Sequence, residues 1–293
     1  MKYKTGSAFR RALEDRLRGH SLGTGLPLIR LRKLVAFDRL LARLHAAGPE
    51  AWVLKGGFAL QLRFGVSSRT TKDLDLLLRG ANLLTWDRLR QAASTDLGDW
   101  FSFEVGNPQS EPLEDQPGGH RFQVRSLLDG RSFENFLVDV DAGDPVVDQP
   151  EIVETPDLLA FAGIAPVPIP TVPLTQQIAE KLHAYTRFQH GSESARVRDL
   201  VDILLIASRA RLDGRQLGSA IQSTFSSRST HPLPDRLPGP PSKWESSFRS
   251  SARELGLEWS DLGAATEAAR RFLNPILKGN RAGEWDPAAW SWV

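Results

Sequence analysis

The sequence has no cysteine among its 293 residues, which excludes disulfides and metal sites built from thiolates. It also has no apolar run near the ~18 residues needed to cross a bilayer, so no membrane partner is expected. The first residues are rich in Arg, unlike the apolar centre of a secretory signal. The net charge is only +2, with a sequence pI of about 9.0. We therefore expect a cytoplasmic protein with one large domain or two modest ones.

Several common catalytic motifs are absent as well. The six histidines are scattered, and His183 and His190 do not have the HExxH spacing of a zinc site. No Gly-x-Ser-x-Gly elbow is present, so a serine hydrolase is unsupported.

Two aspartates one residue apart, Asp73 and Asp75 in the run TKDLD at 71–75, are the most informative feature that is present. The leucines around them predict a buried strand over residues 73–78. On a strand, residues i and i+2 point to the same face, about 7 Å apart. Two carboxylates held this close repel each other unless a cation lies between them. Oxygen ligands alone suit Mg²⁺, which also contacts substrate phosphates, so the pair indicates phosphoryl-type chemistry.

A glycine pair lies upstream, in Lys55-Gly56-Gly57 between a predicted strand and a predicted helix. Without Cβ atoms, the backbone N–H groups at a helix N-terminus can approach phosphate oxygens. Alone, a Gly-Gly pair is usually an ordinary turn, and an Asp-x-Asp pair often serves to blunt a sheet edge. The order strand, Gly-Gly, helix, acidic strand favours a functional site.

A second acidic pair, Asp139 and Asp141, ends the predicted strand 136–141. Two-metal phosphoryl or nucleotidyl transfer needs a third carboxylate from a neighbouring strand. Asp141 is the favoured candidate and Asp139 the second. The alternative is a strand-end pair that caps the following turn.

A third group lies on two predicted helices. Lys181 is on the helix 175–189, and Asp199 and Asp202 share one face of the helix 194–209. A helical hairpin would bring Lys181 and Asp199 together, with the lysine available to triphosphate oxygens. Taken alone, these are ordinary salt-bridged surface helices.

The order of predicted elements divides the chain. Strands and helices alternate in the first part, whereas helices alone are expected after the proline-rich stretch 164–173. The predicted domains are residues 1–170 and 171–293. Basic residues are concentrated at the start of the chain, which is compatible with a solvated helix face and with a nucleic-acid contact alike; they are Arg10, Arg11, Arg16, Arg18, Arg30, Arg32, Lys33, Arg39 and Arg43.

The ordered motifs resemble those of the AbiEii-like nucleotidyltransferases, toxins of AbiE and MenA–MenT type toxin–antitoxin systems in the DNA polymerase β-like superfamily. The run LKGGFAL at 54–60 with RTTKDLD at 69–75 resembles motif I, and VDVD at 138–141 resembles motif II. Lys181 resembles motif III, and RVRDLVD at 196–202 resembles motif IV. The resemblance covers roughly residues 50 to 250. Two departures are Phe58, where a small hydroxyl residue is common, and Arg198, where lysine is common.

The resemblance implies an α+β fold, with a polymerase β-like mixed sheet, flanking helices and a C-terminal helical domain. It implies a Mg²⁺-dependent enzyme, with Mn²⁺ as a substitute, that transfers a nucleoside monophosphate from an NTP to an acceptor. In tRNA-modifying relatives the acceptor is the 3′ end of tRNA, which blocks aminoacylation and growth. The implied residues are Asp73, Asp75, Asp141, Lys181 and Asp199 for catalysis; Asp73, Asp75, Asp141 and Asp139 for metal; and Lys55, Gly56, Gly57, Arg69, Lys181, Arg196 and Arg198 for nucleotide.

A cognate antitoxin protein is the partner that the resemblance implies. It would act by a protein contact or by phosphorylating a hydroxyl beside the acidic strand, at Ser67, Ser68, Thr70 or Thr71. A phosphate there adds roughly two negative charges near the path of the NTP and would repel it.

Two other functions compete with this one. A small-molecule nucleotidyltransferase of the antibiotic-modifying type would share the acidic strand but lack an RNA-binding surface. A catalytically silent partner protein would keep the fold alone, although the presence of the acidic positions and Lys181 argues against loss of activity.

Overall fold

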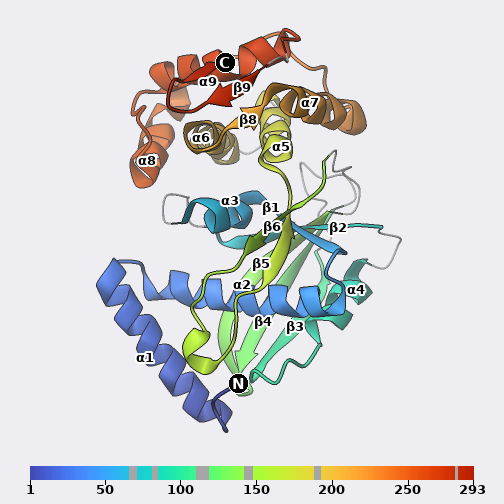
Figure 1. The fold of residues 1–293 in the computed structure, drawn as a ribbon, viewed down its shortest axis with the longest axis vertical. Helices are drawn as coiled ribbons and strands as arrows, with labels where there is room; N and C mark the ends of the chain where they lie inside the picture. Colours follow the sequence, from blue (N-terminus) through green and yellow to red (C-terminus); the bar gives the residue numbers. More distant parts are fainter. Residues whose placement is uncertain (66–70, 81–84, 110–118, 142–147, 188–192, 281–282) are drawn as a thin grey trace. The chain divides into compact units, whose positions relative to one another are not determined.

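The computed structural model describes residues 1–65, 71–80, 85–109, 119–141, 148–187, 193–280 and 283–293 (Figure 1). The chain forms two compact units. The first comprises Met1–Arg63, Thr70–Gly143 and Glu151–Thr171, and the second comprises the remaining residues, chiefly Val172–Val293. None of the helices within the described ranges is long and apolar enough to span a membrane.

The first unit is built on a seven-stranded mixed sheet with the order β3-β4-β5-β2-β1-β7-β6. Two neighbouring pairs, β2 with β5 and β1 with β7, are parallel, and the others are antiparallel. The expected α+β fold with a mixed sheet and flanking helices is confirmed. The strands are β1 (Trp52–Lys55), β2 (Asp73–Leu78), β3 (Phe101–Pro108), β4 (His120–Leu128), β5 (Arg131–Asp141), β6 (Glu151–Glu154) and β7 (Pro168–Thr171).

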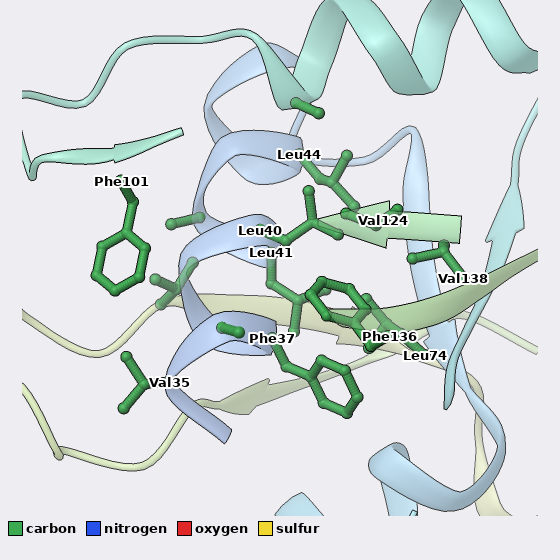
Figure 2. Close-up of a cluster of buried hydrophobic side chains, with 14 of the residues drawn as sticks. Val35, Phe37, Leu40, Leu41, Leu44, Leu74, Phe101, Val124, Phe136 and Val138 are labelled. Atoms are coloured by element: carbon green, nitrogen blue, oxygen red, sulfur yellow. The ribbon is translucent and has the colours of Figure 1, made fainter. Parts of the chain in front are cut away.

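The core of this unit lies between the sheet and helix α2 (Leu28–Ala47). Figure 2 shows Phe37, Leu40 and Leu41 of the helix directed at Phe136 and neighbouring side chains of the sheet. The rings of Phe37 and Phe136 meet edge to face with centroids 5.0 Å apart. Because side chains alternate along a strand, burying one face of β2 and β5 leaves the residues between on the opposite face.

Within the described part of this unit, the other α-helices are α1 (Gly6–Thr24), α3 (Gly56–Phe64) and α4 (Thr85–Ala93). Helix α1 begins at Thr5, whose hydroxyl accepts a hydrogen bond from the Ala8 N–H, and it ends at Gly25 in the left-handed conformation with φ +74°. The helix continues through Gly19 and Gly23 and ends only where Gly25 adopts the left-handed conformation.

The strands β6 and β7 were not predicted, and β7 lies inside the proline-rich stretch interpreted as a boundary. Proline cannot donate to a sheet ladder and is tolerated at the first residue or near an edge. Pro168 is the first residue of β7, and Pro170 faces Ile152 of the edge strand β6. On its other side β7 meets β1 at a single register pair, Leu54 and Thr171.

Most of the basic residues near the start of the chain are engaged within this unit. Arg43 forms a bidentate ion pair with Asp99, with Nη1–Oδ2 at 3.0 Å and Nη2–Oδ1 at 2.6 Å, and Arg39 is buried against Asp38.

Other basic side chains make more exposed contacts. Arg10 donates to the carbonyls of Leu128, Arg131 and Ser132. Arg32 pairs with Glu14, Arg18 with Asp15, and Lys33 with Glu134. Most of these Arg and Lys side chains therefore form ion pairs or hydrogen bonds within the unit. This favours a structural role for them over a nucleic-acid-binding surface.

The expectation of helices alone in the C-terminal part was wrong, because the second unit also holds a small three-stranded sheet of order β10-β9-β8. Its strands have only two or three residues, which is too short for an alternating pattern to be detected in the sequence. The helices are α5 (Leu174–Thr186), α6 (Glu193–Arg209), α7 (Gly214–Arg228), α8 (Glu245–Leu255) and α9 (Leu262–Leu277), and the strands are β8 (Leu212–Asp213), β9 (Glu284–Asp286) and β10 (Ser291–Trp292). The last tryptophans fix the end of the chain through their indole N–H groups. Trp285 donates to the Ala207 carbonyl at 2.7 Å, and Trp292 donates to that of Phe272 at 2.8 Å.

Candidate active site

The acidic strand β2 separates its residues between the two faces of the sheet. Leu74 and Leu76 are fully buried in the core, whereas Asp73 and Asp75 are half-buried on the opposite face. The alternation follows from the sequence DLDL, since only the leucines can enter the core without a charge penalty.

Asp75 lies against the start of helix α3. Gly56, the first residue of that helix, has φ +67°, and a Cβ there would overlap the Asp75 carboxylate. Glycine is thus required at this position for its conformation and for its lack of a side chain. In the same region Lys55 pairs with Asp75 in the antiparallel register of β1 and β2.

The second acidic pair joins the first across a parallel ladder. Asp75 pairs with Asp139, and Leu77 pairs with Asp141. Paired residues on neighbouring strands point to the same face, so Asp73, Asp75, Asp139 and Asp141 all lie on one side of the sheet, which we call the acidic face. Asp139 is the direct neighbour of Asp75, whereas Asp141 lies one step further along.

Each carboxylate of β5 is held by a cation. Lys55 Nζ lies 2.9 Å from Asp141 Oδ2, and both side chains are almost completely buried. Arg121, on β4, forks Asp139: its Nε donates to Oδ1 and its Nη2 donates to Oδ2, each at 2.7 Å. The hydrogen bonds to Asp139 raise the pKa of the Arg121 guanidinium, the negative charges of Asp139, Asp73 and Asp75 add to this, and burial opposes it.

Arg121 was missed by sequence reasoning. The alternation of apolar and polar residues over 121–128 shows that it shares a face with Gln123 and Arg125. Only the register of β4 on β5, which places Arg121 opposite Asp139, reveals its partner. That register depends on tertiary structure.

Within the described residues, no group of three or more carboxylate or imidazole side chains is arranged to hold a metal ion. The donor chemistry nevertheless fits a hard divalent cation, because Asp73, Asp75 and Asp139 supply oxygen atoms on the acidic face. A cationic guanidinium already lies against Asp139. These residues therefore form an environment that attracts positive charge.

In the second unit, helices α5 and α6 bring the third group together. Lys181 Nζ is 2.6 Å from Asp202 Oδ2 and 3.7 Å from Asp199 Oδ1, and Arg196 Nη1 is 3.1 Å from Asp199 Oδ2. Burial raises the pKa of the Asp199 carboxyl, and the charges of Lys181 and Arg196 oppose this effect. Asp202, fully buried, is the closer partner of Lys181. The Arg198 residue is exposed.

The hydroxyl and arginine residues predicted beside the acidic strand fall on either side of the boundary of the described residues. Ser67, Ser68, Arg69 and Thr70 lie outside the described residues. Thr71 is buried, and its hydroxyl donates to the Asp73 carbonyl at 2.9 Å. Any modification of Thr71 therefore requires that hydrogen bond to open.

The sequence profile described as nucleotidyl transferase AbiEii toxin of a type IV toxin–antitoxin system matches residues 39–290. The chain belongs to the AbiEii nucleotidyltransferase toxin family. The expected resemblance is confirmed, and membership in a toxin family implies an antitoxin partner. Among curated proteins there is no significant match.

The chain is similar to several solved structures, and one of them, with a TM-score above 0.5, shares the fold. MenT4, a nucleotidyltransferase toxin from Mycobacterium tuberculosis H37Rv, is 21% identical, with 92% of this chain and 99% of that chain covered and a TM-score of 0.53. JHP933 from Helicobacter pylori is 18% identical, with 85% and 90% coverage and a TM-score of 0.42. A putative nucleotidyltransferase from H. pylori has the same identity and TM-score, with 85% and 93% coverage.

Proposed function

We propose that this AbiEii-family chain is a Mg²⁺-dependent toxin that transfers a nucleoside monophosphate from an NTP to the 3′ end of tRNA in the cytoplasm, thereby blocking aminoacylation. The observation that carries the proposal is the register pair Asp75–Asp139, which gathers carboxylates of neighbouring strands on the acidic face. Mn²⁺ is expected to substitute for Mg²⁺, because both take oxygen ligands.

Asp73, Asp75 and Asp139 are the residues that would hold the metal. A bound divalent ion supplies charge stabilisation to the phosphates and lowers the pKa of an acceptor hydroxyl. We take Asp139 ahead of Asp141 as the third carboxylate. Asp139 neighbours Asp75 in the sheet, whereas Asp141 is tied to Lys55 in a buried pair that solvent does not reach.

The reaction is an in-line displacement at the α-phosphorus. The acceptor oxygen forms a new P–O bond, the bond from the α-phosphorus to the bridging oxygen breaks, and pyrophosphate leaves with that oxygen. The hydroxyl proton passes to a carboxylate oxygen of Asp139. Little covalent chemistry is needed from the protein, because positioning and electrostatics supply most of the rate.

Other residues are assigned to substrate binding. Gly56 and Gly57 would bring N–H groups of α3 to phosphate oxygens. Lys181, oriented by Asp199 and Asp202, would contact the triphosphate. Arg198 is exposed and would add positive charge for the nucleotide, with Arg69 as a further predicted contact. Lys55 and Arg196, the other predicted contacts, are buried in ion pairs with Asp141 and Asp199, so their side chains would not reach the nucleotide.

Transfer from each of four α-³²P-labelled NTPs to total tRNA tests the proposal. Wild type is compared with Asp75→Asn, which keeps the shape of the side chain and removes its charge. We expect label on tRNA with one or more NTPs, dependent on Mg²⁺ and absent in the variant. If label appears only on small molecules, the acceptor is a small molecule and not tRNA. If folded protein transfers no label at all, the chain is better explained as a catalytically silent partner protein.

The antitoxin is proposed to act on the segment before β2. Mass spectrometry of the chain after coexpression with the antitoxin would locate a phosphate on Ser67, Ser68, Thr70 or Thr71. Of these, Thr71 is within the described residues and is buried. An unmodified but inhibited toxin would instead indicate inhibition by a protein contact.

A further inference from the structure

The two cations on the acidic face differ in their access to solvent. The side chain of Arg121 is 34% exposed and that of Asp139 is 8% exposed. By contrast, the side chains of Lys55 and Asp141 are 3% and 2% exposed. Lys55 is buried together with its partner, whereas Arg121 reaches solvent beside its partner.

The guanidinium of Arg121 binds the carboxylate of Asp139, which is the residue paired with Asp75 in the sheet. Both Asp139 oxygens accept a hydrogen bond from the guanidinium. A guanidinium stays charged at every pH that a folded protein tolerates. It therefore neutralises part of the repulsion between carboxylates on the acidic face, and it repels any second cation that approaches them.

We propose that Arg121 is a built-in counter-cation of the acidic face, which holds Asp139 in the metal-free protein and which a divalent metal ion must displace to reach that carboxylate. This inference rests on the proposed function, because it assumes that the acidic face binds metal. Arg121 is a positioning residue, since it acts through Asp139. Its presence sets the metal concentration at which the site fills.

Two opposite effects follow when Arg121 is replaced by glutamine. Metal binding becomes tighter, because a positive charge near the metal is lost and both Asp139 oxygens are freed. The metal-free protein becomes less stable, because the carboxylates on the acidic face are no longer neutralised. A residue that only oriented Asp139 for the metal would give weaker metal binding on removal. The sign of the change in metal affinity therefore separates the two roles.

The experiment is a Mn²⁺ titration of the full chain, in which the electron paramagnetic resonance signal of free Mn²⁺ is followed without nucleotide. We expect Arg121→Gln to bind Mn²⁺ about tenfold more tightly than wild type, from the removal of one nearby unit charge at intermediate dielectric. Arg121→Lys keeps the charge and loses the fork, so it should tighten binding less. The melting temperature without metal should fall in Arg121→Gln and recover when Mn²⁺ is added.

Arg125→Gln is the matched control. Arg125 lies on the same strand and the same face, and its ion pair with Glu104 is half exposed at both ends. Its replacement should leave the Mn²⁺ affinity unchanged.

The outcomes distinguish this inference from the proposed function. Equal or weaker Mn²⁺ binding by folded Arg121→Gln, with normal binding by wild type, would overturn the role of Arg121 and leave the metal site intact. If Arg121→Gln does not fold, unchanged binding by Arg121→Lys would overturn it. No Mn²⁺ binding by wild type, or binding that survives Asp75→Asn, would refute the proposed metal site and the inference with it.

Discussion

Replacing Lys55 with methionine leaves the shape of the side chain nearly unchanged but removes the cation that faces Asp141. The two side chains are 3% and 2% exposed, and Nζ and Oδ2 are 2.9 Å apart. Removing one partner of a buried pair leaves an uncompensated charge and costs about 3–5 kcal/mol. That is a large share of the roughly 5–15 kcal/mol by which folded proteins are stable.

The assay must report on the first unit alone, because the chain forms two compact units. Hydrogen–deuterium exchange in peptides from β1 and β5 meets this requirement. A loss of 3–5 kcal/mol corresponds to exchange faster by about two to three and a half orders of magnitude in these peptides. In the exposed control Arg125→Gln, where both side chains are 52% exposed, the loss should be about 0–1 kcal/mol.

The double variant Lys55→Met with Asp141→Leu completes the test. Exchanging the whole buried pair for apolar groups of similar volume is expected to restore most of the lost stability. If Asp139 is the third metal ligand, this variant should also bind Mn²⁺ as wild type does. If the hydrogen–deuterium exchange rate in Lys55→Met is within tenfold of the wild-type rate, the Lys55–Asp141 pair does not stabilise the first unit to the expected extent.

Three further predictions concern other parts of the chain. Gly56→Ala should abolish nucleotidyl transfer, because a Cβ there meets the Asp75 carboxylate at a φ of +67°; transfer at wild-type rate would contradict this geometry. Burial is the main cause that lowers the pKa of His183 from its ordinary 6.5 to about 3. Between these two pH values the unfolded chain binds more protons than the folded chain does. Stability therefore falls as the pH drops from about 6.5 towards 3. In urea titrations across this range, His183→Asn should lose less stability than wild type does. Trp285→Phe should cost about 1–3 kcal/mol in urea unfolding of the second unit, because it leaves the Ala207 carbonyl without its indole donor.

The strands and helices that carry the motifs could be predicted from the sequence because their signals are local. The leucines beside Asp73 and Asp75 require a buried strand, and the alternation of side chains then places both carboxylates on one face. Lys181 and Asp199 were expected to meet across a helical hairpin, and the ion pair at 3.7 Å bears out this contact. The strand β7 was missed, because its prolines indicate a loop when read alone.

What the sequence by itself determined is the set of chemical groups and their order: a glycine pair, two acidic strands, and a lysine followed by an acidic helix. Only the tertiary structure decided which groups meet. Asp139 rather than Asp141 neighbours Asp75, Lys55 is bound to Asp141, and Arg121 forks Asp139. These partners belong to strands far apart in the chain, and their register is set by packing in the core. No pattern along one strand encodes its register on the next, because a strand fixes only which of its own residues share a face.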